Sequence, residues 1–318
     1  MKLAVVSLAG SKFRTYFVMK KLIGLIAFSV VLFVGCGKEP LPETPGGGGN
    51  EDDGGGEVIE KKIPINIAGT ADNAFDFGAT MGVYVVNNTS AGAGTLLPNG
   101  NHADNICFTY SNTWSPETTI YWADQDTKAD IYCYAPYSRA ISDVENHLFS
   151  VATNQSDNAA YKSSDLLWGK SSNVAPTDVA ISVKMARLMS RVVVELVAGN
   201  GYTQEQLASA KVSICSVQAD AKINLATGSV SPTGTTTEIA TYNSAEEYQA
   251  VVVPQTINNA DLVKVTIDNK DYTLQQSLTL ESGKQHKCTV TISKVNQGLN
   301  IGISDWAMST DDYGGIVK

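Results

Sequence analysis

The chain has 318 residues, and its 32 acidic residues outnumber its 23 lysines and arginines, for a net charge of −9 at pH 7. This balance argues against nucleic acid and against an anionic membrane surface as partners, because both attract basic patches. The length leaves room for one large hydrophobic core or two of ordinary size.

The start of the chain has the features of an export signal. Two consecutive lysines precede thirteen apolar or small residues at positions 22–34. A membrane-spanning helix needs about 20 apolar residues, whereas a shorter run after a positive cluster is typical of a secretory signal peptide. We interpret residues 1–35 as this signal peptide. Met19, directly before the lysines, is the expected start, which makes residues 1–18 a surplus extension.

A cysteine at the end of the apolar run indicates a lipid anchor. The sequence Leu-Phe-Val-Gly-Cys at residues 32–36 resembles a bacterial lipobox, with Phe33 in place of the usual leucine. This interpretation makes Cys36 the first mature residue, carrying diacylglycerol and a further acyl chain such as palmitate. Two acyl chains hold a protein stably on a membrane. The alternative is an ordinary buried cysteine after a short helix.

A polar tether follows the cysteine. Residues 36–57 consist mostly of glycine, proline and acidic residues, which bury too little apolar surface to offset the entropy of the chain. A flexible coil of this length spans about 25 Å on average. Without the leader, the chain keeps 18 basic and 32 acidic residues, a balance that suits an exported surface domain.

From residue 58 onward, apolar and polar residues alternate, which is typical of β-strands. The first run places Ile63, Ile65 and Ile67 on one face. Further short runs rich in β-branched and aromatic residues are MGVYVVN (81–87), TIYWAD (119–124), ADIYCYAP (129–136), VAISVKM (179–185), RVVVELV (191–197), KVSICSV (211–217), YQAVVVPQ (248–255), LVKVTID (262–268), YTLQQSLTL (272–280) and HKCTVTIS (286–293). The series predicts an all-β fold of antiparallel β-sandwiches.

One short helix and one domain boundary interrupt the series. Thr203 and Gln206 match a capping box and predict one or two helical turns through Ala210, with a polar turn as the alternative. A seven-stranded sandwich takes about 100 residues, so this number of strands predicts two sandwiches in tandem. We place them at residues 58–187 and 188–318.

Residues that could carry catalysis or hold a metal form no motif. His102, His147 and His286 lie far apart, without a second ligand at metal spacing. The first two are expected in loops and the third beside a strand, as solvated or half-buried side chains. Sequences such as G-x-S-x-G, H-E-x-x-H or a P-loop are absent, and DQDTKAD at residues 124–130 lacks the glycine and glutamate of a calcium loop. The sequence predicts no catalytic residue, cofactor or metal site, and a protein that is not an enzyme.

The tryptophans and cysteines have a structural interpretation. We expect the tryptophans in core or sheet-to-loop packing, with a sugar-stacking platform as the alternative; they are Trp114, Trp122, Trp168 and Trp306. The cysteines after the lipobox lack C-x-x-C spacing; they are Cys107, Cys133, Cys215 and Cys288. Export permits disulfides, but we favour free buried thiols because Cys133 and Cys288 lie on alternating runs.

Several segments together resemble one protein family. From about residue 71 to residue 307, the chain resembles the fimbrillins of Bacteroides-type bacteria, which are pilins and accessory subunits of type V pili. The segments that carry the resemblance are KADIYCYAPYS (128–138), DLLWGKS (165–171), ISVKMARLMSRVVVEL (181–196), VVVPQTI (251–257), LESGKQHKCTVTI (280–292) and IGISDWA (301–307). The resemblance implies two tandem transthyretin-like β-sandwich domains, which agrees with the number of strands.

The resemblance also implies a route and partners. Such proteins are exported as lipoproteins, reach the outer membrane surface, lose an N-terminal strand to a protease, and accept a strand from the next subunit. An added strand satisfies the unpaired backbone groups and apolar pockets of a sheet edge, and a head-to-tail contact of this kind makes a filament. The implied partners are other fimbrial subunits, the outer membrane through the lipid, and a host or bacterial receptor in adhesion.

The fit to this route depends on a few residues. The candidate first strand covers residues 63–68, or the Val-Ile pair before it. Family members are often clipped after arginine, but the first arginine beyond the leader is Arg139. Lys61 and Lys62 are therefore the candidate processing positions. The candidate donor strand, residues 299–318, is short and broken by glycines, which favours a tip, anchor or minor subunit over a shaft subunit.

Two other classes of function stay as alternatives. A stand-alone surface lipoprotein that binds a glycan or a host protein would cluster exposed aromatic residues on one loop face and would have no removable strand. A glycosidase or protease would need two carboxylates, or a nucleophile and a base, converging in a pocket.

Overall fold

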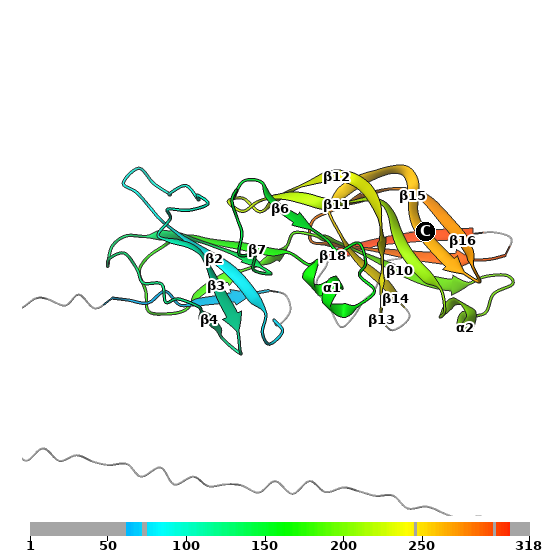
Figure 1. Ribbon diagram of the computed structural model, residues 1–318, viewed down its shortest axis with the longest axis horizontal. Coiled ribbons are helices and arrows are strands. Elements are labelled where there is room, and N and C mark those ends of the chain that lie inside the picture. The colour runs from blue at the N-terminus through cyan, green and yellow to red at the C-terminus, as the bar shows by residue number, and fades with distance from the viewer. Residues whose placement is uncertain (1–61, 72–74, 245–246, 295–296, 306–318) are drawn as a thin grey trace, which may run out of the picture. The chain divides into compact units, whose positions relative to one another are not determined.

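The computed structural model describes residues 62–71, 75–244, 247–294 and 297–305 (Figure 1). Strands make up 57% of the described residues and helices 4%, so the all-β prediction is confirmed. Judged by backbone contacts, residues Ile59–Lys318 form one compact unit. Cys36 and Lys61 lie outside the described residues.

The first half of the described chain is built on an antiparallel six-stranded sheet. In spatial order its strands are β4 (Trp114–Pro116), β3 (Ala103–Tyr110), β2 (Thr80–Asn87), β5 (Ala129–Ala135), β7 (Leu167–Val174) and β9 (Ala186–Arg187). The central strand β5 is buried along its whole length. It tolerates Asp130 because this carboxylate pairs with Lys170 Nζ at 2.8 Å and accepts a hydrogen bond from the Asn173 N–H at 2.7 Å.

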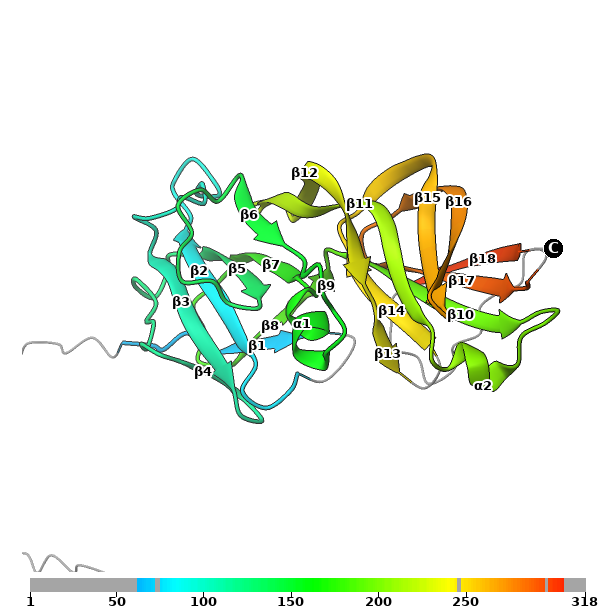
Figure 2. The same ribbon diagram turned by 45° about the vertical axis from the view of Figure 1, so that its right-hand side comes forward.

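A separate two-stranded sheet holds the start of the described chain. β1 (Ile67–Thr70) runs parallel to β8 (Ile181–Lys184), with Ile67 opposite Ile181. Figure 2 shows the two strands side by side. The observed strand thus begins later in the chain than the strand expected at residues 63–68. The reason is that backbone hydrogen bonds to β8 begin only at residue 66.

Two further sheets form the second half. One has the order β13 (Tyr242–Ser244), β14 (Glu247–Val252), β10 (Ser190–Ala198), β17 (Lys284–Ile292) and β18 (Gln297–Asp305). The other has the order β12 (Ser229–Ala240), β11 (Lys211–Asn224), β15 (Gln255–Ile267) and β16 (Lys270–Leu280), with β6 (His147–Ser150) paired to β11. Both sheets contribute buried side chains to one apolar cluster, as in a β-sandwich (Figure 2).

One pairing in the second half departs from the antiparallel prediction. β10 and β17 run parallel at the centre of their sheet, with Val192 opposite His286. Parallel neighbours need a long connection, and the hairpins between β10 and β17 supply it. Three consecutive valines of β10 are fully buried, as is typical of a strand that is covered on both faces.

Buried apolar side chains form two clusters. The smaller runs from Ile65 to Met185 and belongs to the first half, and the larger runs from Tyr84 to Ile292 and joins side chains of both halves. The larger cluster therefore crosses residue 187, where we expect the border between two sandwiches. That division into two domains stays a prediction.

A long hairpin connects the two halves. β11 and β12 form it, and the outer part of β11 pairs with β6. At its tip, Trp168 Nε1 donates a hydrogen bond to the Leu225 carbonyl at 2.7 Å. Gly228 has a φ of +72° and lies against the same indole, so that a Cβ there would stand 2.5 Å from Trp168 Cε3. The close approach of hairpin and indole therefore requires glycine at this position.

The two helices are short. α2 (Gln204–Leu207) begins at the predicted capping box, because Thr203 Oγ1 accepts from the Gln206 N–H and Gln206 Oε1 accepts from the Thr203 N–H. The sequence pattern does not predict α1 (Asn158–Ser163), which Asp157 caps. Within the described part of the chain, neither helix has the length and apolar character to span a membrane.

Gly228→Ala tests the packing of the hairpin on Trp168. We expect the free energy of unfolding in urea to fall by about 2–4 kcal/mol, because the methyl group combines a left-handed backbone with a clash. Gly100→Ala is the matched control, since Gly100 has a φ of +90° with no atom within 4 Å of its added Cβ. There we expect only about 1 kcal/mol. Equal losses in the two variants would contradict the packing argument.

Candidate functional site

The described chain opens with residues 62–71, here called the N-terminal segment, and its first half is held along one edge. The Ile65 N–H donates to the Ile120 carbonyl at 2.8 Å, and the Trp122 N–H donates to the Ile63 carbonyl at 2.9 Å. These are main-chain bonds, so they depend on backbone position more than on side-chain identity.

The second half of the N-terminal segment is bonded to β8 instead. The Ile181 N–H donates to the Asn66 carbonyl at 2.8 Å, and the Met185 N–H donates to the Thr70 carbonyl at 2.7 Å. Asn66 Nδ2 adds a bond to the Asp178 carbonyl at 3.2 Å. The segment thus changes partners along its length, from residues of the long loop before β5 to β8.

Three alternate residues of the N-terminal segment face the smaller core. Ile65 and Ile67 are 2% and 4% exposed, and each buried isoleucine contributes about 1.5–3 kcal/mol. Gly69 is buried as well, and its carbonyl accepts from Trp114 Nε1 at 3.0 Å. A Cβ at Gly69 would stand 3.1 Å from Met81 Sδ and 3.3 Å from Trp114 Nε1. At this point the backbone itself is the surface that packs on the core.

The surroundings of the N-terminal segment have the shape of a slot for one β-strand. We call this slot the strand groove; its edges are residues 120–122 and β8, and its floor includes Met81, Trp114 and Met185. The groove offers main-chain donors along its edges and apolar side chains below. This is the combination that an added strand uses for binding.

An empty strand groove would be unfavourable. The N–H groups of Trp122, Ile181 and Met185 and the indole N–H of Trp114 all donate to the N-terminal segment. With the segment in place, all four residues are at most 9% exposed. Its departure would therefore expose these donors and the apolar floor of the groove to water, which costs about 25 cal/mol per Å² of apolar surface. The groove therefore favours occupation by some strand at all times.

The predicted processing positions, Lys61 and Lys62, lie at the start of this segment. Lys62 is exposed and lines an open cleft of about 540 Å³ together with His102 and Tyr121. His102 Nε2 lies 2.5 Å from the Tyr121 carbonyl oxygen across this cleft. Lys61 is outside the described residues. A cut at either lysine would leave residues 63–70 joined to β2, so the cut alone does not empty the strand groove.

Part of the predicted donor strand already belongs to a sheet. β18 pairs antiparallel with β17 along residues 297–305 and is the outer strand of its sheet. Donation of residues 299–305 to another subunit would first break this pairing. The rest of the predicted donor, residues 306–318 with Trp306, lies outside the described residues.

The other candidate residues do not converge. His147 is half-buried as expected, but it begins β6 instead of lying in a loop. His286 lies within β17 with no exposed surface, which corrects the expectation of a solvated or half-buried side chain for this histidine. Trp114 and Trp122 belong to the smaller core, and Trp168 holds the β11–β12 hairpin. Within the described ranges, no group of three His, Cys, Asp or Glu residues is placed to hold a metal ion.

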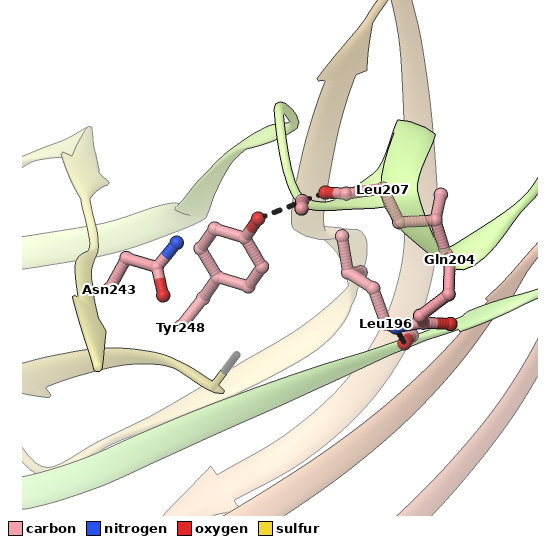
Figure 3. A pocket seen from close by; sticks show the side chains of 6 residues that line it. Leu196, Gln204, Leu207, Asn243 and Tyr248 are labelled. Carbon is pink, nitrogen blue, oxygen red and sulfur yellow. Dashed lines mark hydrogen bonds between the residues drawn. The ribbon is translucent and has the colours of Figure 1, made fainter. Parts of the chain in front are cut away.

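A second cavity is far smaller than the cleft. It has a volume of about 70 Å³ beside α2 and is lined by Leu196, Gln204, Leu207, Ala208, Asn243 and Tyr248. Two of its polar side chains are bonded to the backbone, since the Tyr248 hydroxyl donates to the Leu207 carbonyl and Gln204 Nε2 to the Leu196 carbonyl, each at 3.1 Å (Figure 3). The volume suits one or two water molecules, at about 30 Å³ each.

The four described cysteines are free thiols, as expected. Burial raises the pKa of the Cys133 and Cys288 thiols to about 12 and that of Cys215 to about 11, and it also raises the pKa of Cys107. Thiols of this kind stay protonated at neutral pH, and the thiolate is the reactive form. They act as small apolar side chains.

Sequence reasoning located the strand but missed the floor beneath it. Trp114 and Met185 are not adjacent to the N-terminal segment in sequence, and only the fold brings them together. The one local signal is Gly69, a glycine that continues the inward-facing series after two alternating isoleucines. A glycine within a strand often marks close approach of another group.

Comparison with known proteins finds relatives of one kind. The model of the fimbrillin-like family matches residues 68–306. A curated protein from Bacteroides uniformis, described as a candidate fimbrium subunit, Fim1C, is 23% identical over 250 residues, which cover 74% of this chain and 80% of that protein.

Solved structures share the fold. A candidate cell adhesion protein from Bacteroides uniformis superimposes with a TM-score of 0.64 at 21% identity, over 77% of this chain and 99% of that chain. Another, from Bacteroides ovatus, has a TM-score of 0.65 at 17% identity, over 78% and 99%. The fold is therefore one that these adhesion proteins also have.

His286→Gln tests the burial of the central histidine. Burial lowers the pKa of His286 below its ordinary value of 6.5, so its contribution to stability is complete above pH 6.5 and is lost as the pH falls through the lowered pKa. We expect the free energy of unfolding of the natural chain to decline with acidification at up to about 1.4 kcal/mol per pH unit from this group. Urea titrations from pH 7.5 to 5 should show a shallower decline in His286→Gln. Parallel declines in both proteins would contradict the assignment.

Proposed function

Because the chain belongs to the fimbrillin-like family, we propose that it is a fimbrial subunit that assembles by donor-strand addition. In this proposal, the N-terminal segment leaves the strand groove and a strand of a neighbouring subunit takes its place. The family consists of fimbrial and adhesion proteins and is not an enzyme family, and its members belong at the cell surface or in the fimbrium.

The way in which the N-terminal segment is held supports the proposal. Main-chain hydrogen bonds at both edges and two buried isoleucines account for its binding. Such contacts depend on strand geometry and on alternation of apolar residues, so another strand with the same pattern can replace them. Because release of the segment would expose the apolar floor of the groove to water, it favours capture of a new strand over an empty groove.

Processing at Lys61 or Lys62 has a defined role in this scheme. A cut there separates the body from the tether and gives the N-terminal segment a free end. An incoming strand can then displace the segment from that end, one hydrogen bond at a time, while the buried donors stay satisfied throughout. The exposure of Lys62 directly before the first bonded residue, Ile63, supports this order of events.

Before processing, the lipid at Cys36 would hold the body at the outer membrane surface. The glycine-rich tether of residues 36–57 separates the lipid from the first bonded residue, which lets the body work clear of the lipid headgroups. Adhesion to a host or bacterial receptor would then be a property of the assembled fimbrium.

One observation favours a second candidate function, that of a stand-alone surface lipoprotein binding a glycan. The cleft of about 540 Å³ beside Lys62 has Tyr121, 42% exposed, at its rim together with His102 and Asp104. An exposed aromatic ring with nearby polar groups is a common setting for a sugar. This function would not require the N-terminal segment to leave.

Strand exchange can be tested directly in the full chain. A site-specific protease sequence placed between Ala71 and Phe75 would separate the N-terminal segment from β2 without removing it. After cutting, we expect a labelled peptide of residues 63–70, IPINIAGT, to replace the segment and to co-elute with the protein in gel filtration. The uncut protein and a scrambled peptide are the controls. Cut protein that retains its own segment and takes up no peptide would refute donor-strand addition.

Cys36→Ser tests the lipid anchor. The variant has no thiol for the thioether linkage, so we expect its release from the membrane fraction of expressing cells, measured by fractionation and immunoblotting. Cys107→Ser is the matched control, because that half-buried thiol lies inside the fold and the variant should remain on the membrane. Retention of Cys36→Ser on membranes would rule the anchor out.

A further inference from the structure

The floor of the strand groove leaves no space for a side chain at one position. The added Cβ of Gly69 would meet Met81 Sδ at 3.1 Å, Trp114 Nε1 at 3.3 Å and Met185 Sδ at 3.6 Å. The methionines can yield by some tenths of an ångström. The indole cannot, because its N–H is bonded to the carbonyl of Gly69 itself. A side chain larger than a methyl group would overpack this site.

The two preceding inward positions have the opposite requirement. Ile65 and Ile67 are almost completely buried in the same cluster, so their places need large apolar side chains. The outward residues Asn66 and Thr70 are exposed and only donate or accept at the edge. The groove therefore fits a strand in which two alternating apolar residues are followed, two positions later, by glycine.

The C-terminal end of the chain is similar in sequence to this strand and fails at one place. Residues 65–70 read INIAGT and residues 299–304 read LNIGIS, with Ile303 where the first has Gly69. Two other registers also put apolar residues at both isoleucine positions, namely Ile301 with Ile303 and Trp306 with Met308. They place Asp305 and Thr310, respectively, at the position of Gly69. Read in either direction, residues 297–318 hold no pair of alternating apolar residues followed two positions later by glycine.

We infer that Gly69 and the floor beneath it select the incoming strand, and that the strand comes from a different subunit whose donor has glycine at this third inward position. The inference depends on the proposed strand exchange and names its partner class. Residues 297–318 of a second copy are excluded as the donor, because each of their apolar registers puts a side chain larger than methyl, Ile303, Asp305 or Thr310, at the position of Gly69. The chain then occupies one fixed place in a mixed assembly and does not extend a filament of its own kind.

Four labelled peptides test the selection on the cut chain described above. They are IPINIAGT, its Gly69→Leu form, QGLNIGIS of residues 297–304, and the Ile303→Gly form of that peptide. We expect IPINIAGT to be retained at least about tenfold more tightly than its Gly69→Leu form. The C-terminal peptide should bind as weakly as the leucine form, and its Ile303→Gly form should recover binding.

The outcomes separate the inference from the proposed function. Equal retention of IPINIAGT and its leucine form overturns the selection by Gly69 while strand exchange stands. A ladder of oligomers formed by the concentrated cut chain without any peptide overturns the exclusion of a second copy. Failure of all four peptides refutes strand exchange.

If all four peptides fail to bind, the requirement for glycine at position 69 can still be tested in the intact chain. Gly69→Leu should lower the urea midpoint of unfolding, because the leucine would lift β1 from Trp114. Thr70→Leu is the matched control, since Thr70 is exposed on the same strand and its replacement should leave the midpoint unchanged. Equal midpoints for the two variants would overturn the inference.

Discussion

Four hydrogen-bond donors at the edges and floor of the strand groove have their acceptors on one short strand near the start of the described chain. The N–H groups of Trp122, Ile181 and Met185 and the indole of Trp114 all donate to the N-terminal segment. With the strand in place these residues are at most 9% exposed, so loss of the strand would expose the donors and the apolar side chains beneath them to water. The strand itself is short and is fixed mainly through its backbone. The main-chain hydrogen bonds that favour a filled groove do not depend on which chain supplies the strand.

Contacts that do not involve the N-terminal segment hold the two halves of the fold together. The larger core joins side chains of both halves, and the β11–β12 hairpin is fastened to the first half by Trp168 and by pairing with β6. Loss of β1 from such a body would remove the two-stranded sheet of β1 and β8 and leave the three larger sheets joined.

Local patterns in the sequence predicted which residues form strands and helices better than they predicted which strands pair. The alternating isoleucines at 63, 65 and 67 indicated the first strand, and Thr203 with Gln206 indicated α2, because both signals are local. The parallel neighbours β10 and β17 are far apart in sequence, so no local pattern could pair them. The burial of His286 and the position of Trp114 under Gly69 arise from tertiary packing. The lipobox at Cys36 and the lysines at 61 and 62 remain sequence-based predictions.

Amide hydrogen exchange at Trp122, Ile181 and Met185 tests the central claim most directly. It should be followed in the full chain, in the chain cut between Ala71 and Phe75 and washed free of its segment, and in the cut chain refilled with a strand peptide. The account predicts slow exchange, fast exchange and slow exchange again at these three amides, while Val193 in the larger core stays protected throughout. Protection of the three amides that persists after the segment is gone would contradict the account.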